Sequence, residues 1–260
     1  MAWLHYGLLQ QGKHQKAKTV LDEMLEFVPK DPTKGARGYL VGMQSRHLIE
    51  DRAISKETNL DLDVKVDDIG IMPQSVRSFL RAQIAFEDKD TESLKSEVDW
   101  LSKKITTASM QMEDDGLVMC AAGSSRYAPN ENSVKSAQVT LNQIQGLIAL
   151  VENDQDKFRA LMEEATALED QTNFPTGPPN VTMPSFEQYG DWLLKQGEYD
   201  MALKQFDKSL VRMPRRFKSL KGRMMALKNL NLKNQVEIVE KELETMLADA
   251  DVEAKRFLSE

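Results

Sequence analysis

Residues 183–216 read MPSFEQYGDWLLKQGEYDMALKQFDKSLVRMPRR, and this stretch decides the fold. Gly190 and Ala202 put small side chains where two antiparallel helices of one unit cross closely. Gly197 permits the left-handed backbone that commonly ends a helix. Pro214 stops the second helix and restricts the residue before it. The stretch therefore predicts two antiparallel helices that turn at Gly197.

The same spacing occurs a second time near the start of the sequence. Gly12, Ala17 and Pro29 stand at the same offsets as the later glycine, alanine and proline, and His5 takes the place of Gly190. Small residues and a proline at these offsets are the signature of the tetratricopeptide repeat, whose period is about 34 residues. We assign the two clear repeats to residues 1–34 and 183–216.

Weaker copies lie between and after these repeats. Apolar residues at i, i+3 and i+4 predict amphipathic helices, and they give degenerate pairs at residues 74–105, 134–170 and 217–248. Thr91 is the expected N-cap of one of these helices. A single helix is expected over 35–56 and a short polar one over 252–258. The fold class predicted is all-α, a right-handed superhelix of about eleven or twelve helices in antiparallel pairs, whose curvature creates a concave surface.

Three irregular insertions interrupt the helical pattern, at residues 57–73, 110–133 and 171–184. The first alternates briefly like a strand, and the second mixes apolar residues with turn formers. The third is a Pro/Gly linker, which its prolines should hold extended. Loops of this length in a compact array are usually functional or disordered.

The segment 154–214 resembles the C-terminal part of a group of bacterial tetratricopeptide proteins that are largely uncharacterised. The likeness rests on Ala167-Leu168-Glu169-Asp170 at a helix end, the proline-rich link, Tyr189-Gly190 and the turn Pro214-Arg215-Arg216-Phe217. The opening Trp3-Leu4-His5-Tyr6 with Gln10-Gln11-Gly12 is similar to a helix midway along those proteins. The resemblance implies a fragment or shortened member of a family that is often exported, and it implies no activity.

Composition excludes several classes of function. The net charge of −7 and pI of about 5.2 speak against a broad nucleic-acid interface, which needs a basic surface. The one basic cluster, Arg215-Arg216-Phe217-Lys218, is interpreted as a solvated turn. No apolar run approaches the ~20 residues that cross a bilayer, and the first residues do not form a signal peptide. We expect no membrane insertion and leave the compartment open.

Candidate chemical groups are few. The three histidines are scattered in the sequence, so no metal site is expected. The acidic residues at 61–68 lack the glycine and the closing glutamate of an EF-hand, which favours a solvated loop. Cys120 lies in an apolar run and is interpreted as a buried structural thiol, with a cysteine-dependent enzyme as the remote alternative. No phosphate-binding loop or nucleophile elbow occurs, so we expect no enzyme and no cofactor.

A binding surface can be assigned from the repeat pattern. In tetratricopeptide proteins, certain positions of the first helix of each repeat line the concave face. The corresponding residues here are mixed in chemistry: Tyr6, Gln10, Gln83, Phe86, Glu87, Asp191 and Lys195. They do not match the Lys/Asn/Arg clamp by which some relatives hold acidic chaperone tails. They favour an extended peptide or a helix in the groove, or else packing against neighbouring repeats.

Two interpretations of function follow. The first is a non-catalytic scaffold that binds a protein or peptide on the concave face. The alternative is the C-terminal half of a longer solenoid, whose role is intramolecular stacking or self-association. Terminal repeats usually carry a polar cap, but the first helix is rich in apolar residues, which predicts a homo-oligomer through that helix: Trp3, Leu4, Tyr6, Leu8 and Leu9.

Overall fold

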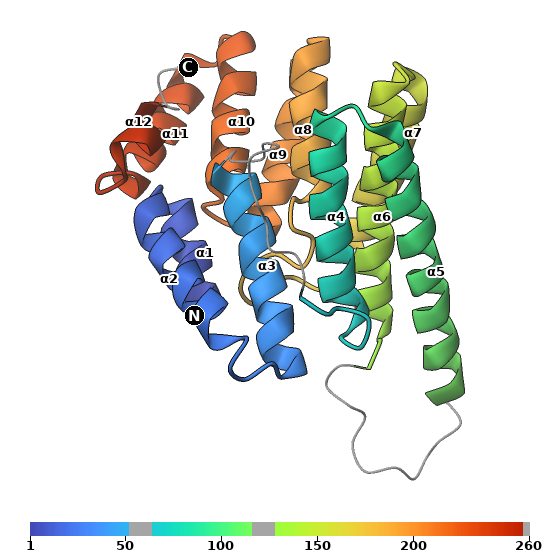
Figure 1. Cartoon of the computed structure of the whole chain (residues 1–260). Helices are drawn as coiled ribbons and strands as arrows, with labels where there is room; N and C mark the ends of the chain where they lie inside the picture. The colour runs from blue at the N-terminus through green and yellow to red at the C-terminus, as the bar shows by residue number, and fades with distance from the viewer. Residues whose placement is uncertain (52–63, 116–127, 257–260) are drawn as a thin grey trace.

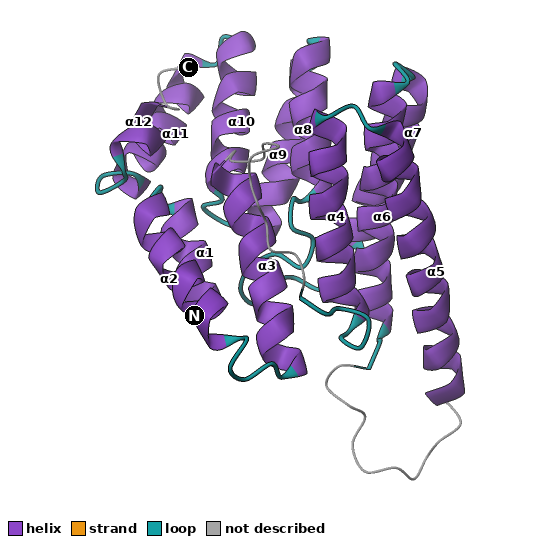
Figure 2. Ribbon diagram, viewed as in Figure 1, coloured by secondary structure: helices purple, strands orange, loops and turns teal. Residues whose placement is uncertain are grey.

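The computed structural model describes residues 1–51, 64–115 and 128–256, and these form an all-α protein (Figures 1 and 2). The predicted fold class is confirmed at this level, and no strand occurs within the described ranges. Eleven helices there have nine residues or more, and α12 has five. The helices are α1 (Ala2–Gln10), α2 (His14–Phe27), α3 (Lys34–Asp51), α4 (Ile71–Glu87), α5 (Thr91–Asp115), α6 (Glu131–Val151), α7 (Gln155–Asp170), α8 (Ser185–Gln196), α9 (Tyr199–Arg212), α10 (Phe217–Asn229), α11 (Lys233–Met246) and α12 (Val252–Arg256).

Helices that are close in the sequence are also neighbours in space. Contacting pairs are α1 with α2, α4 with α5, α6 with α7, α8 with α9, and α10 with α11. The first helices of consecutive pairs also touch, because α4 contacts α6, and α8 contacts both α6 and α10. Helix α3 has no such companion and packs between α1, α2 and α4. In Figure 1, α3, α4 and α5 are drawn in front of α6 to α10, and α11 and α12 return to the side where α1 and α2 lie.

Small residues let α8, α9 and α10 approach one another. Phe206 of α9 is fully buried, and its ring lies between two glycines of the neighbouring helices. A Cβ atom added at Gly190 would lie 2.8 Å from the ring, and one added at Gly222 would lie 2.3 Å from it. The close-packing role predicted for Gly190 is confirmed. Gly222 plays the same part in a segment where the sequence pattern indicated no glycine role.

The helix ends agree with most of the local expectations. Gly12 and Gly197 follow α1 and α8 with φ of +66° and +77°, the left-handed conformation predicted for them. The cap expected at Thr91 is wrong by one position. Asp90 accepts a hydrogen bond from the Ser93 backbone N–H at 3.0 Å, because α5 begins at Thr91 and the residue before the first helical position is the one whose side chain can reach this N–H.

Two predicted insertions are shorter than expected where the structure describes them. Residues 64–70 contain no strand, and α4 begins at Ile71. Helix α5 continues to Asp115 instead of ending before residue 110, since residues 110–115 contain Met, Gln and Glu, which are strong helix formers. Residues 57–63 and 116–127 lie outside the described residues, and the interpretation of Cys120 lies there with them.

The linker at residues 171–184 crosses the inner side of the helix array (Figure 1). Side chains from three helices donate to its backbone carbonyls. The Arg46 guanidinium donates to Pro179 O at 2.9 Å, and the Gln143 amide donates to Met183 O at 2.9 Å. Arg212 donates to Thr172 O at 3.1 Å. The array therefore holds an extended stretch of its own chain.

The first and last helices also meet (Figure 1). The Asp251 backbone N–H donates to Gly12 O at 2.9 Å, and the Asp251 carboxylate accepts from the Gln15 N–H at 2.9 Å. This carboxylate caps the first turn of α2 from a distant part of the chain. A Cβ added at Gly12 would lie 2.9 Å from the Ala250 Cβ, so the contact is close.

Candidate functional site

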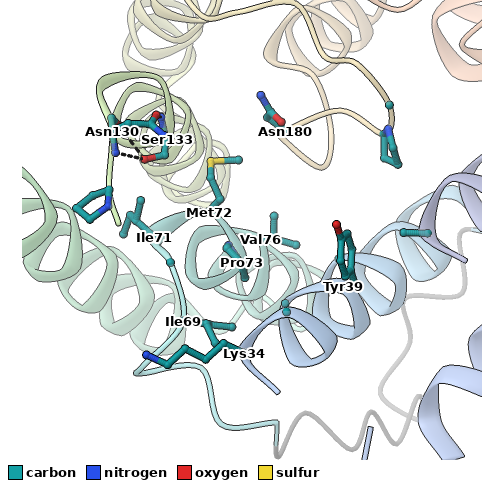
Figure 3. A pocket seen from close by; sticks show the side chains of 18 of the residues that line it. Lys34, Tyr39, Ile69, Ile71, Met72, Pro73, Val76, Asn130, Ser133 and Asn180 are labelled. Carbon is teal, nitrogen blue, oxygen red and sulfur yellow. Dashed lines mark hydrogen bonds between the residues drawn. The ribbon is translucent and has the colours of Figure 1, made fainter. Parts of the chain in front are cut away.

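A cavity of about 430 Å³ lies where α3 faces the first turns of α4 and α6 (Figure 3). The linker closes one side of it, and the start of α1 forms part of the rim. This volume falls within the range of small-ligand and peptide-side-chain sites. Its lining comprises Ala2, Trp3, Lys34, Gly35, Gly38, Tyr39, Gly42, Arg46, Ile69, Gly70, Ile71, Met72, Pro73, Val76, Ala128, Pro129, Asn130, Ser133, Thr176, Gly177, Pro178 and Asn180.

One wall of the cavity is a glycine face of α3. Gly35, Gly38 and Gly42 line it, and spacings of three and four residues put them on one side of the helix. A Cβ at Gly38 would lie 3.2 Å from the Pro73 ring, so α3 and α4 approach closely there. Bare backbone along this side of α3 leaves room that larger side chains would fill.

Arg46 continues the same face of α3. A Cβ at Gly42 would lie 2.8 Å from its terminal nitrogen, so the guanidinium folds back over the glycine. Among the described residues, the guanidinium donates one hydrogen bond, to Pro179 O. Its Nε atom is buried and has no hydrogen-bond partner among these residues. Burial lowers the pKa of Arg46 to about 10, with Arg216 acting in the same direction. The group remains a cation at neutral pH.

The two helix N-termini at the cavity differ in how they are capped. Asn130 caps α6 by accepting from Ser133 N, and Ser133 Oγ accepts in return from Asn130 N, each at 2.9 Å. At α4 the N-cap residue is Gly70, which has no side chain to accept a bond. Ile71 and Met72 of that first turn line the cavity. The positive end of α4 is therefore left without a side-chain cap at the cavity wall.

Two exposed aromatic side chains stand at the rim. Trp3 is 65% exposed and Tyr39 is 52% exposed. A Cβ at Gly177 would lie 2.6 Å from the Trp3 indole, so this ring lies against the linker backbone. Figure 3 shows Tyr39 and Met72 pointing from α3 and α4 into the same open space, with Asn180 on its far side. Exposed aromatics beside a cavity provide apolar contact area for a ligand.

A buried ionic cluster fixes α3 against the C-terminal helices. Arg216 is 0% exposed and donates to Glu187 at 2.6 and 2.9 Å. It also lies 2.7 Å from a Glu50 carboxylate oxygen. Ser219 donates to Glu187 at 2.8 Å. The solvated-turn interpretation is therefore wrong for Arg216, because two carboxylates from other helices compensate its charge inside the protein.

Electrostatics around the cluster follow from burial and pairing. Burial by itself would raise the pKa of Glu50, but Arg216 and Lys218 outweigh it and hold the pKa below its usual value. Burial raises the pKa of Tyr6, which lies near Arg216. Burial, His47 and Arg46 lower the pKa of His5 to about 3. The opposite charges of the cluster therefore offset one another, and the neighbouring His5 is neutral.

The structure places the seven predicted binding residues outside the cavity lining. Tyr6 and Gln10 lie at the buried cluster, where the Gln10 amide oxygen accepts from the Phe217 backbone N–H at 2.9 Å. The others lie in the C-terminal halves of two helices: Gln83 and Phe86 half-buried and Glu87 exposed on α4, with Asp191 and Lys195 exposed on α8. Their role in binding stays a prediction.

The cavity residues had a visible signal in the sequence. The run Gly35-Ala36-Arg37-Gly38, followed by Gly42 and Arg46, places three glycines and an arginine on one helical face. Repeat positions alone do not select this face, because α3 has no paired helix.

The structure brings two of the three scattered histidines together. The rings of His5 and His47 have centroids 5.5 Å apart. No group of three or more His, Cys, Asp or Glu side chains with metal-binding geometry occurs in the part of the chain that the structure describes. Of the acidic residues at 61–68, Asp67 forms an ion pair with Lys104, and Asp68 forms one with Arg37.

Comparison with protein-family models, curated proteins and solved structures finds no match. Within the described ranges, none of the helices is long and apolar enough to cross a bilayer.

Proposed function

We propose that this chain is a tetratricopeptide-like superhelix that acts as a non-catalytic scaffold and binds an extended segment of a partner protein. The contacts between helices in chain order support the superhelix. So do the left-handed glycines after α1 and α8 and the glycine contacts of Phe206.

The observation that supports binding most directly is the way in which the array holds its own linker. Arg46, Gln143 and Arg212 donate to three separate carbonyls of residues 171–184, those of Pro179, Met183 and Thr172. Such donors recognise backbone and do not depend on sequence. The cavity lies next to this linker, because linker residues and Arg46 both line it.

The rim supplies the apolar contacts that a partner segment needs. Trp3 and Tyr39 are rigid, amphipathic side chains of the type that contributes most to protein interfaces. They flank the glycine face of α3, which admits a chain close to the helix backbone. A partner that enters between them continues along the inner side of the array, toward the predicted residues Gln83, Phe86 and Glu87 on α4 and Asp191 and Lys195 on α8.

The test compares partner proteins captured by the unaltered chain and by variants. Tyr39→Ala should lose specific partners, because it removes a rim aromatic. Phe27→Ala is the matched control, since Phe27 is 48% exposed but lies on α2 outside the cavity lining. The joint change Gln83→Ala with Lys195→Ala tests the predicted surface. Identical partner lists for Tyr39→Ala and Phe27→Ala would contradict the cavity as the binding site.

A second candidate function is self-association or stacking through α1. Leu4 is 58% exposed and Met1 is 54% exposed beside Trp3, which supports an apolar contact at this helix. The sedimentation mass should rise with concentration, and Leu4→Ser should abolish the rise. A monomeric mass at all concentrations would contradict this candidate.

A further inference from the structure

The charge of the cavity lining is opposite to that of the whole chain. Lys34 and Arg46 are the charged residues that line it, and no Asp or Glu is among the lining residues. The chain as a whole has a net charge of −7. A cavity whose charged lining residues are both cations, in an acidic protein, is electrostatically complementary to an anion.

Arg46 is the stronger of the two cations for this purpose. Its Nε atom is buried without a hydrogen-bond partner among the described residues, and no carboxylate there forms an ion pair with it. The nearby carboxylate of Glu50 is engaged by Arg216. A buried cation without its own counter-ion is costly, and the lowered pKa of Arg46 has the same cause. An anionic ligand in the cavity would remove this cost.

The uncapped first turn of α4 adds to the same field. Gly70 provides no side-chain acceptor, so the N–H groups of the first turn, apart from Pro73, which has none, are left without a side-chain cap. Ile71 and Met72 line the cavity next to it. The positive end of a helix favours a negative group. The arginine and the helix end thus act together.

We propose that the cavity binds the C-terminal carboxylate of a peptide chain, with Arg46 as the charge partner; this proposal rests on the proposed function. A carboxylate matches the planar guanidinium. Its single charge suits a site with one buried cation, whereas the double charge of a phosphate calls for more compensation. The apolar wall of Ile69, Met72 and Val76 receives the last side chain of the peptide.

The site differs from the clamp positions excluded in the sequence analysis. Asp191 and Lys195 of α8 do not line the cavity. Its walls come from α3, which has no paired helix, and from the start of α4. The proposal is therefore specific to this glycine face.

The experiment offers the full chain three pools of randomised tetrapeptides without Asp or Glu at the random positions. One pool has free C-terminal carboxylates, the second has C-terminal amides, and the third has amides with one fixed internal Glu. Retained peptides are quantified by mass spectrometry after ultrafiltration. We expect the free-acid pool to be retained at least about tenfold over both amide pools.

Variants connect this preference to the residues. Arg46→Gln should abolish it. Gly42→Ala should weaken it without removing a charge, because the new Cβ would lie 2.8 Å from the Arg46 guanidinium and must displace it. Arg223→Gln is the control, since Arg223 pairs with Asp207 on α10 and α9 and does not line the cavity. Circular dichroism establishes that each variant is folded.

The outcomes separate the two proposals. Equal retention of the acid and amide pools would overturn the carboxylate proposal but not the proposed function. A preference for the free-acid pool that survives in both Arg46→Gln and Gly42→Ala would have the same consequence. Retention of the internal-Glu pool equal to that of the free-acid pool would also overturn it, by assigning the site to a side-chain carboxylate. Retention of no pool would overturn peptide binding in the cavity, and with it the proposed function at this site.

Discussion

Replacing Arg216 with methionine removes the charge at the centre of the buried cluster but keeps a long unbranched side chain. The change leaves Glu187 and Glu50 buried without the guanidinium that now lies 2.6 to 2.9 Å from them. Removing one partner of a buried ion pair costs about 3–5 kcal/mol. Two carboxylates lose their partner here, so we expect the upper part of this range. The midpoint of thermal unfolding should fall by roughly 10 °C or more.

The pH dependence of this loss provides an independent check. In the unaltered chain the pKa of Glu50 lies below its usual value, so the stability from Glu50 is present above pH ~4.5 and is lost as the pH falls. In Arg216→Met the largest influence that lowers the pKa of Glu50 is gone, so burial, opposed only by Lys218 and Gln10, raises that pKa. The folded variant then binds more protons than the unfolded chain, and its stability falls as the pH rises. The difference between the two proteins should therefore be larger at pH 8 than at pH 5.

The measurement is urea unfolding followed by circular dichroism at both pH values. Arg223→Met is the matched control, because Arg223 forms a surface pair with Asp207 at 2.7 Å, and surface pairs contribute about 0–1 kcal/mol. A triple variant with Met at 216 and Leu at 50 and 187 should recover much of the loss. A cost for Arg216→Met no larger than that for Arg223→Met would refute the assignment of the cluster.

Three further predictions concern stability. The free energy of unfolding should fall by about 1.4 kcal/mol per pH unit below pH ~6.5, because the pKa of His5 is lowered to about 3 in the folded state; urea unfolding should show a shallower slope for His5→Phe. Gly222→Ala should cost about 1–3 kcal/mol, and the additional change Phe206→Leu should recover part of it if the ring contact is the cause. Asp251→Ala should cost about 0.5–2 kcal/mol through the lost bond to Gln15, and faster amide exchange at the start of α2 would locate the effect.

The sequence predicts those features of the fold that depend on local backbone requirements. Gly12 and Gly197 must follow helices because they adopt positive φ, and Gly190 must be small because Phe206 lies against it. These demands recur at fixed offsets, so spacing reveals them. The local pattern does not predict the continuation of α5 to Asp115, because Met110 and Met112 stand directly before a run of turn formers.

The buried cluster could not be predicted in this way. Arg216 and Glu187 are 29 residues apart, and Glu50 comes from a distant helix. An arginine in a basic, proline-containing turn has the local pattern of a solvated residue, and only the contacts of Arg216 with Glu50 of α3 and Glu187 of α8 decide otherwise. The cavity was missed for a related reason: its walls come from five segments, and repeat positions describe only the paired helices.

Helix α3 connects the cluster with the cavity. Glu50 is one helical turn beyond Arg46, so these two residues lie on the same side of α3. At the end of α3 that bears Glu50, Arg216 lies against the carboxylate, and Lys218 donates to Ile49 O. The preceding turns of the same face, with Gly35, Gly38 and Gly42, form the glycine wall of the cavity. Helix α3 packs between α1, α2 and α4, and the contacts with Arg216 and Lys218 add a further restraint at the end of the helix that bears Glu50. A ligand that binds only the folded chain must stabilise it. Arg216→Met should loosen α3 and so lower the affinity of the cavity for its ligand, even though Arg216 does not line the cavity. Affinity unchanged in Arg216→Met would show that the packing against α1, α2 and α4 holds α3 in place without the cluster.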